Sequence, residues 1–225
     1  MKKQRDRARQ ARNSDNSMGV QTDLLIGVKS PSEYVGYTQL EVEKATISDI
    51  LADGALVQST EGEYAQVIFD KTPFYAEMGG QVADKGNVLD AKGNVIASVE
   101  DVQHAPNGQN LHTLKLHQAI KVGDQVTLKV DAHFHSKVEK NHTATHLLDQ
   151  ALRNVFGEHT QQAGSLVEPN YLRFDFTHFG QVTDDDLAKV EAIVNEKIFE
   201  ELPVTTTVTD QATGKKNGCH RVVQR

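Results

Sequence analysis

The chain has 225 residues, of which 38% are hydrophobic and 6% aromatic, enough apolar material for one good core or two modest ones. Its single cysteine, Cys219, excludes an internal disulfide, and no apolar run approaches the ~20 residues that span a bilayer. The N-terminus is basic but lacks the apolar stretch of a signal peptide. We therefore expect a soluble, cytoplasmic protein of two subdomains with no membrane partner.

Charge is spread unevenly along the sequence. Six basic residues and one aspartate give the first twelve residues a net charge of +5, which leaves −12 for the rest of a chain whose total is −7. Affinity for a phosphate backbone scales with the phosphates that are neutralised, so this acidic body is not expected to grip nucleic acid broadly. We interpret residues 1–30 as a basic N-terminal arm and linker, the solvated end of a helix from a larger protein; an RNA contact is the alternative.

The region 31–131 predicts a small, Gly-rich antiparallel β-barrel. Short β-branched segments are separated by turn signals such as "ADG", "EGE" and "PNGQN", at the spacing typical of a small barrel or sandwich. The clearest of these segments are "ATISDI", "YAQVIFD", "NVIASVEDV" and "QVTLKV".

From residue 132 to 225 the period changes, and we expect an α/β subdomain with helices packed on an antiparallel sheet. Ser136 and Glu139 predict a capping box that starts a long helix, which ends at Gly157. "YLRFDF" alternates as a strand does, "TDDDLAKVEAIVNEKIFEEL" starts as a capped helix with an apolar stripe from Leu187 to Ile198, and "PVTTTVT" predicts a closing strand. The fold class is α+β.

Two motifs suggest chemistry. His142 and His146 in "NHTATHLL" lie one helical turn apart with Thr145 beside both, which is the helical half of many zinc sites but supplies only two ligands. Gly79 and Gly80 precede Gln81 in "TPFYAEMGGQVADKG"; glycines allow a backbone to approach a ligand closely, and the amide of Gln81 both donates and accepts hydrogen bonds. Polar surface histidines and a bulge at the barrel rim are the structural alternatives.

Together these motifs resemble a known family. "TPFYAEMGGQVADKG", "NHTATHLL", "QQAGSLV" and "LRFDFTHF" occur in the order and approximate spacing of the editing region of bacterial alanyl-tRNA synthetases and of their free-standing editing relatives. The resemblance runs from the N-terminal arm to about Asp210. It implies a fragment that carries the post-transfer editing domain, which hydrolyses the ester joining serine or glycine to the 3′ end of alanine tRNA.

The resemblance also implies roles for single residues. His142 and His146 match two zinc ligands, Thr145 matches a threonine that lines the amino-acid pocket, and Gln162 matches a glutamine implicated in hydrolysis. Gln81 matches the glutamine of the Gly-Gly-Gln loop near the site and is expected to be catalytic together with Thr145 and Gln162, while Gly79 and Gly80 of that loop are expected to bind the substrate. Metal and water would then replace a protein nucleophile, and the site is expected where this loop meets the His142 face of the helix.

The departures from the family concern the metal site and the C-terminus. The family's later zinc-binding C-x-x-x-H is missing, because Cys219 and His220 are adjacent, and Asp149 stands where the family often has a histidine. The ending "GKKNGCHRVVQR" resembles a shifted reading frame or an altered terminus. An inactive RNA-binding or structural remnant of the same domain is therefore one alternative. A release-factor-like hydrolase, which also uses Gly-Gly-Gln, is another, although its loop is expected in a basic setting.

Overall fold

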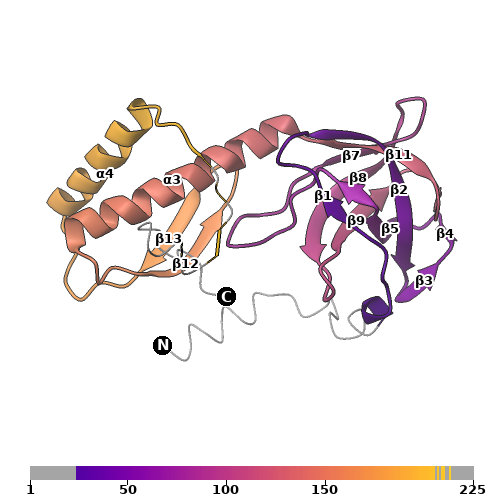
Figure 1. Ribbon diagram of the computed structural model, residues 1–225, viewed down its shortest axis with the longest axis horizontal. Helices are drawn as coiled ribbons and strands as arrows, with labels where there is room; N and C mark the ends of the chain where they lie inside the picture. The colour runs from indigo at the N-terminus through magenta and orange to yellow at the C-terminus, as the bar shows by residue number, and fades with distance from the viewer. Residues whose placement is uncertain (1–23, 206, 208, 211–212, 214–225) are drawn as a thin grey trace. The chain divides into compact units, whose positions relative to one another are not determined.

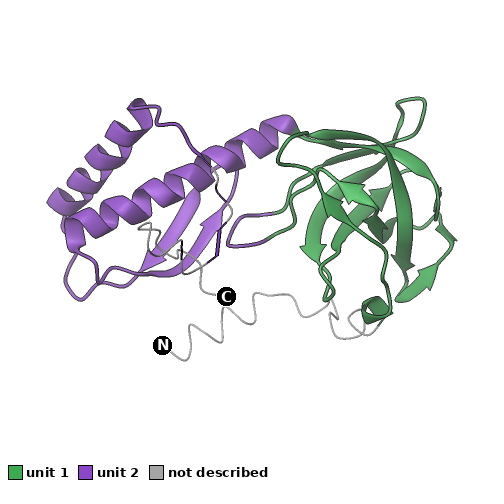
Figure 2. Ribbon diagram, viewed as in Figure 1, with its two compact units in different colours: residues 1–77, 83–131 green, residues 78–82, 132–225 purple. Residues whose placement is uncertain are grey.

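The structure, a computed structural model, describes residues 24–205, 207, 209, 210 and 213. It divides into two compact units, coloured separately in Figure 2. Unit 1 comprises the residues up to Glu77 together with Ala83–Asp131, and unit 2 comprises Met78–Val82 and the chain from Ala132 onward. Within the described ranges, no helix combines the length and the apolar character that crossing a membrane requires.

Unit 1 is a closed antiparallel β-barrel, which confirms the architecture predicted for this region (Figure 1). Each strand pairs with the next, and the last pairs with the first, so the barrel leaves no free edge around its circumference. In spatial order the six strands are β2 (Glu41–Ala52), β5 (Tyr64–Phe69), β9 (Asn110–Leu116), β8 (Val95–His104), β7 (Gly86–Leu89) and β11 (Gln125–Val130). All four segments that the sequence singled out as strands match these elements, with only Asp70 and Asn94 falling one residue outside them.

Short strands complete the surface of the barrel. β3 (Ala55–Val57) returns along β2 as a hairpin. The remaining strands form two separate pairs, β1 (Glu33–Tyr34) parallel to β6 (Lys71–Thr72) and β4 (Ser59–Thr60) antiparallel to β10 (Ile120–Lys121).

The interior of the barrel is filled by inward-facing apolar residues from all six strands, because successive side chains of a strand point to opposite faces. Phe69, Phe74 and Leu114 are fully buried in it. The polar side chains of His112 and Thr72 are also fully buried, and both ring nitrogens of His112 have partners. Nε2 lies 2.8 Å from the Thr72 hydroxyl and Nδ1 lies 3.1 Å from the Val67 carbonyl oxygen.

Part of the segment interpreted as a linker is tied to unit 1. A helical turn at residues 24–26 buries Leu25, which packs with Val28 in a small apolar cluster against Ile68. The Gln109 side chain donates to the carbonyl oxygens of Val28, at 3.1 Å, and of Ser30, at 2.8 Å. The basic arm itself, residues 1–12, lies outside the described residues.

In unit 2 the long helix α3 packs on a β-hairpin, and α4 packs on α3 (Figure 1). The two helices and the second strand of the hairpin were predicted, whereas its first strand was not. The core of unit 2 consists of Ala151, Leu152 and Val190, with Phe174 and Phe176 packed against them. The alternation of "YLRFDF" therefore places Phe174 and Phe176 against this core and leaves Arg173 and Asp175 exposed. The elements are α3 (Ala132–Phe156), β12 (Gln162–Val167), β13 (Leu172–Phe176) and α4 (Asp184–Phe199).

The two predicted helix starts have different outcomes. Thr183 caps α4 in a capping box with Asp186, as predicted: the Thr183 hydroxyl accepts from the Asp186 amide, and the Asp186 carboxylate accepts from the Thr183 amide. The box predicted at Ser136 is wrong, because α3 already begins at Ala132, directly after β11. Glu139 therefore lies inside the helix, where its carboxylate is 3.4 Å from His135 Nε2.

Two further expectations for unit 2 are corrected. The apolar stripe of α4 is buried only near its middle, at Val190, whereas Leu187 and Ile198 are 52% and 50% exposed. The closing strand predicted for residues 203–209 does not form at 203–205, 207 or 209, the part of it that the structure describes. β-branched residues favour a strand only where a neighbouring strand completes the hydrogen bonds, and these residues have none. Cys219 and His220 lie outside the described residues.

Candidate functional site

The face of α3 that carries the two histidines is ordered as the helical spacing predicts. The rings of His142 and His146 stack at a centroid distance of 5.0 Å and an angle of 20°. Burial, and then electrostatic repulsion from the neighbouring His146 imidazole, lower the pKa of His142. Thr145, between them in sequence, is buried and its hydroxyl donates to the Asn141 carbonyl oxygen at 2.8 Å.

The Gly-Gly-Gln segment belongs to unit 2, where it lies beside β12. The Gln81 amide donates to the Met78 carbonyl at 3.2 Å and closes a tight turn in which Gly79 and Gly80 have φ values of +66° and +89°. Val167 then donates to the Gly80 carbonyl at 2.7 Å and accepts from Val82 at 3.1 Å. The turn is thus followed by a short parallel bridge between Gln81 and Val167.

This turn brings together residues that are distant in the sequence. The Gln81 side chain is 5% exposed, and its Oε1 lies 2.5 Å from Nδ1 of His142, 61 positions away. Close approach also explains the second glycine: a Cβ on Gly80 would lie 2.5 Å from Ser165 Oγ and 2.7 Å from the Ser165 carbonyl oxygen. The structure therefore joins the glycine motif to the histidine face of α3.

Gln162 lies at the start of β12 and is linked to the same turn through Ser165. Its Nε2 donates to Ser165 Oγ at 2.8 Å, and Ser165 Oγ is 3.4 Å from the Gly79 carbonyl oxygen. The other amide atom, Gln162 Oε1, is buried without a hydrogen-bond partner among the described residues. An acceptor in that state is available to a water molecule or a ligand donor.

Two contributors to this region escaped the sequence analysis. Ser165 stands within "QQAGS" but has no signal of its own; only its contacts with Gln162 and Gly79 identify it. Asn141 anchors the start of the histidine motif by donating to the Glu168 carbonyl at 2.6 Å. Asp149, noted as a departure from the family pattern, forms an ion pair with Arg153 on the next turn, 3.2 Å from Oδ2 to Nε.

At the candidate site, the potential metal ligands are the two imidazoles of His142 and His146. The described residues present no group of three or more His, Cys, Asp or Glu side chains that is arranged around a common point. Zinc takes at least three protein ligands in most sites, and imidazole nitrogen is one of its preferred donors. His142 and His146 thus fit part of a zinc site, in donor type and in their position on one helix face.

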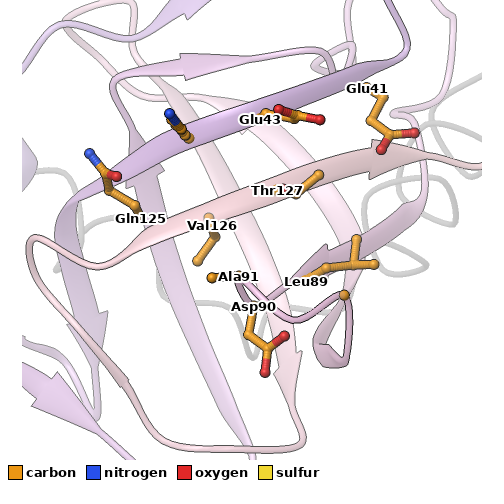
Figure 3. Close-up of a pocket in the computed structure, with 10 residues that line it drawn as sticks. Glu41, Glu43, Leu89, Asp90, Ala91, Gln125, Val126 and Thr127 are labelled. Carbon is orange, nitrogen blue, oxygen red and sulfur yellow. The ribbon is translucent and has the colours of Figure 1, made fainter.

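A separate hollow lies on unit 1 and contains none of the predicted site residues (Figure 3). It is lined by β2, β11 and the turn after β7, and three carboxylates border it, those of Glu41, Glu43 and Asp90. The Glu41 carboxylate pairs with Lys129 at 2.8 Å, and Asp90 accepts from the amides of Lys92 and Asn94 within its own turn. Two of the three carboxylates therefore have structural partners.

Comparison with known proteins identifies the family. Residues 1–134 match the model of the family described as tRNA synthetases class II (A). Because this match covers more than half of the 225 residues, the chain belongs to the class II (A) tRNA synthetases.

The similar curated proteins are alanine–tRNA ligases. Over 97% of this chain, the identity is 66% to the enzyme of Levilactobacillus brevis, 63% to that of Lactiplantibacillus plantarum and 62% to that of Pediococcus pentosaceus. The match covers 25% of each of those proteins, so the chain spans about a quarter of the length of these relatives. The resemblance to alanyl-tRNA synthetases that the motifs indicated is confirmed.

Proposed function

We propose that unit 2 is the editing region of an alanine–tRNA ligase and that it hydrolyses seryl and glycyl esters of alanine tRNA. The observation that carries the proposal is the convergence of three separate motifs, in which Gln81 meets His142 while Gln162 connects to the same turn. The proposal assigns tRNA as the partner and localises the protein to the cytoplasm, where tRNA is charged.

The need for such a region follows from the limits of binding. The aminoacylation pocket of a synthetase that binds alanine cannot strongly reject glycine, which is smaller, or serine, which adds one hydroxyl. A second site that hydrolyses the wrong product solves this problem. In the reaction, water attacks the ester carbonyl, the bond to the terminal ribose oxygen breaks and that oxygen takes a proton, which releases the free amino acid and intact tRNA.

The residues of unit 2 take distinct parts in this proposal. Gln162 orients the water, using its buried Oε1, which has no partner among the described residues, as the acceptor. Thr145 already donates its hydroxyl hydrogen to Asn141, so its oxygen is free to accept from the hydroxyl of a seryl group. The backbone of Gly79 and Gly80 lines the approach of the terminal nucleotide.

His142 and His146 would hold a zinc ion by two of its ligands. When bound, the ion supplies positive charge for a carbonyl that becomes an oxyanion. Since the described residues supply only this pair, we expect substoichiometric zinc after dialysis and slow hydrolysis unless zinc is in excess. One tightly held zinc per chain that is lost on Cys219→Ser would contradict that expectation.

The test is hydrolysis of seryl-tRNA(Ala) by the full chain over a zinc titration. We expect a zinc-dependent rate above spontaneous hydrolysis, reduced at least about tenfold by Gln162→Ala, in line with the loss of a group that positions water. Gln161→Ala removes the neighbouring, exposed amide and serves as the matched control, which should leave the rate unchanged.

The alternative, an inactive RNA-binding or structural remnant, predicts a different result. Binding of tRNA without acceleration of hydrolysis at any zinc concentration would reject the editing proposal and favour the remnant. The acidic body weighs against general RNA binding, since the chain carries a net charge of −7 despite its basic first twelve residues.

A further inference from the structure

The contact between Gln81 and His142 constrains where the imidazole carries its proton. The atom of Gln81 that faces the ring is Oε1, which only accepts hydrogen bonds. At 2.5 Å from Oε1, Nδ1 of His142 must therefore be the donor. A neutral imidazole has one N–H, so the lone pair is left on Nε2.

The main chain holds the Gln81 amide in this position. The backbone N–H of Gln81 closes the turn at Gly79 and Gly80. The bridge to Val167 then holds the backbone of the residues on both sides of Gln81. Contact of Gly80 with Ser165 leaves no space for the turn to move toward β12. The Gln81 side chain, whose Oε1 is the acceptor, is therefore buried and extends from a backbone that hydrogen bonds hold in place.

We propose that Gln81 is a positioning residue that fixes His142 in the Nδ1–H tautomer and directs its Nε2 lone pair to the metal-binding face shared with His146. The role rests on the proposed function, in which His142 is a zinc ligand. It also gives Gln81, which the sequence resemblance placed among the catalytic groups, a role that acts through its hydrogen bond to His142. A hydrogen bond of this kind at the second ring nitrogen orients metal-binding histidines generally.

The tautomer can be read directly in the metal-free chain by long-range ¹H–¹⁵N correlation at a pH above 8, with His142 assigned from the spectrum of His142→Asn. We expect a protonated Nδ1 and an unprotonated Nε2 in the wild-type chain. In Gln81→Leu, which removes the acceptor while filling the space, the Nε2–H form should become the main species. Gln81→Glu restores an acceptor and should restore the wild-type tautomer.

Zinc affinity gives a second measurement that does not involve hydrolysis. Loss of an orienting partner typically weakens metal binding by about 10- to 100-fold. We expect a weakening of that order in Gln81→Leu, and affinity within about threefold of wild type in Gln81→Glu and in the exposed control Gln161→Leu. A wild-type spectrum with Nε2–H at His142 would overturn the proposal, as would an unchanged zinc affinity in Gln81→Leu.

These outcomes are separable from those of the editing proposal. The expected tautomer and zinc affinities, found together with no hydrolysis of seryl-tRNA(Ala), would reject the editing function and support the positioning role. Hydrolysis of seryl-tRNA(Ala) by a wild-type chain whose His142 carries its proton on Nε2 would support the editing function and reject the positioning role. Backbone amide spectra of Gln81→Leu show whether unit 2 of that variant remains folded. If unit 2 unfolds in the variant, the tautomer of His142 in the wild-type chain decides whether Gln81 has the positioning role.

Discussion

The barrel of unit 1 and the helical unit 2 bury their apolar side chains to different extents. Among the described residues, twenty-one buried apolar residues form one cluster inside the barrel, whereas the cluster of unit 2 has three. Both units expose some large apolar side chains, but in unit 2, where few are buried, these include Phe179 at 93%, Phe199 at 85% and Val204 at 84%. A closed barrel completes its own core, but a two-stranded hairpin under two helices encloses little volume.

The comparison bears on function because the candidate site lies wholly in the less buried unit. Gln81, His142 and Gln162 are held by hydrogen bonds and by the turn at Gly79 and Gly80 more than by a large apolar core. Regions with few buried apolar contacts open at lower free energy than packed cores. We therefore expect unit 2 to respond to changes in its polar network and unit 1 to respond to changes in packing.

The largest expected effect is a cavity in the barrel. Phe69 is fully buried and packs edge-on against His112, so Phe69→Ala should lower the free energy of unfolding of unit 1 by about 3 to 5 kcal/mol. Phe199→Ala, at an 85% exposed position of unit 2, should change stability by less than about 0.5 kcal/mol. Urea unfolding followed by resolved amide resonances of each unit measures both, and equal effects would remove the contrast between the units.

Protonation of His112 should destabilise the barrel in acid. Burial lowers the pKa of His112 from 6.5 to about 4, so below pH 6.5 the unfolded chain takes up a proton that the folded barrel does not. At 1.36 kcal/mol per pKa unit, stability is complete above pH 6.5 and falls by about 3 kcal/mol as the pH approaches 4. The measurement is the unfolding free energy at pH 7.5 and 4. In His112→Gln the loss of unfolding free energy between pH 7.5 and pH 4 should be smaller by about 3 kcal/mol. An equal loss in this variant would show that other groups cause the pH dependence.

Two adjacent glycines test whether the site turn depends on local space. Alanine in the left-handed conformation costs about 1 to 2 kcal/mol at either position. A Cβ on Gly79 meets nothing within 4 Å, but one on Gly80 meets Ser165 side-chain and backbone atoms. Gly80→Ala should therefore destabilise unit 2 more than Gly79→Ala and displace Gln81 from His142, which the tautomer of His142 reports. Similar values for the two variants would show that the turn adapts.

The smallest expected effect concerns the start of α4. Thr183→Ala removes the hydroxyl that accepts from the Asp186 amide and should lower the stability of unit 2 by about 1 kcal/mol. Thr183→Ser keeps the hydroxyl and should be close to wild type. Because the cap is local, the resonances of unit 1 should not change in either variant; a shift of the barrel's unfolding midpoint would show that the two units are thermodynamically coupled.

Local features of this protein followed from the sequence alone, because each depends on residues a few positions apart. The capping box of Thr183 and Asp186, the alternation that turns Phe174 and Phe176 inward, and the stacking of His142 on His146 arise from helix and strand periods. Four of the six barrel strands, β2, β5, β8 and β11, were found for the same reason, whereas β7 and β9 were not singled out. Their alternation and turn signals are written in consecutive residues.

Only the tertiary structure decided which distant segments meet. The closure of β11 on β2, the bridge between Gln81 and Val167, and the packing of Leu25 and Val28 on the barrel join residues far apart in sequence. It also decided where local signals failed: Ser136 lies within α3, and Leu187 and Ile198 remain exposed although their spacing predicts burial. An apolar stripe specifies a face but not its partner, and burial requires that some other segment pack against that face.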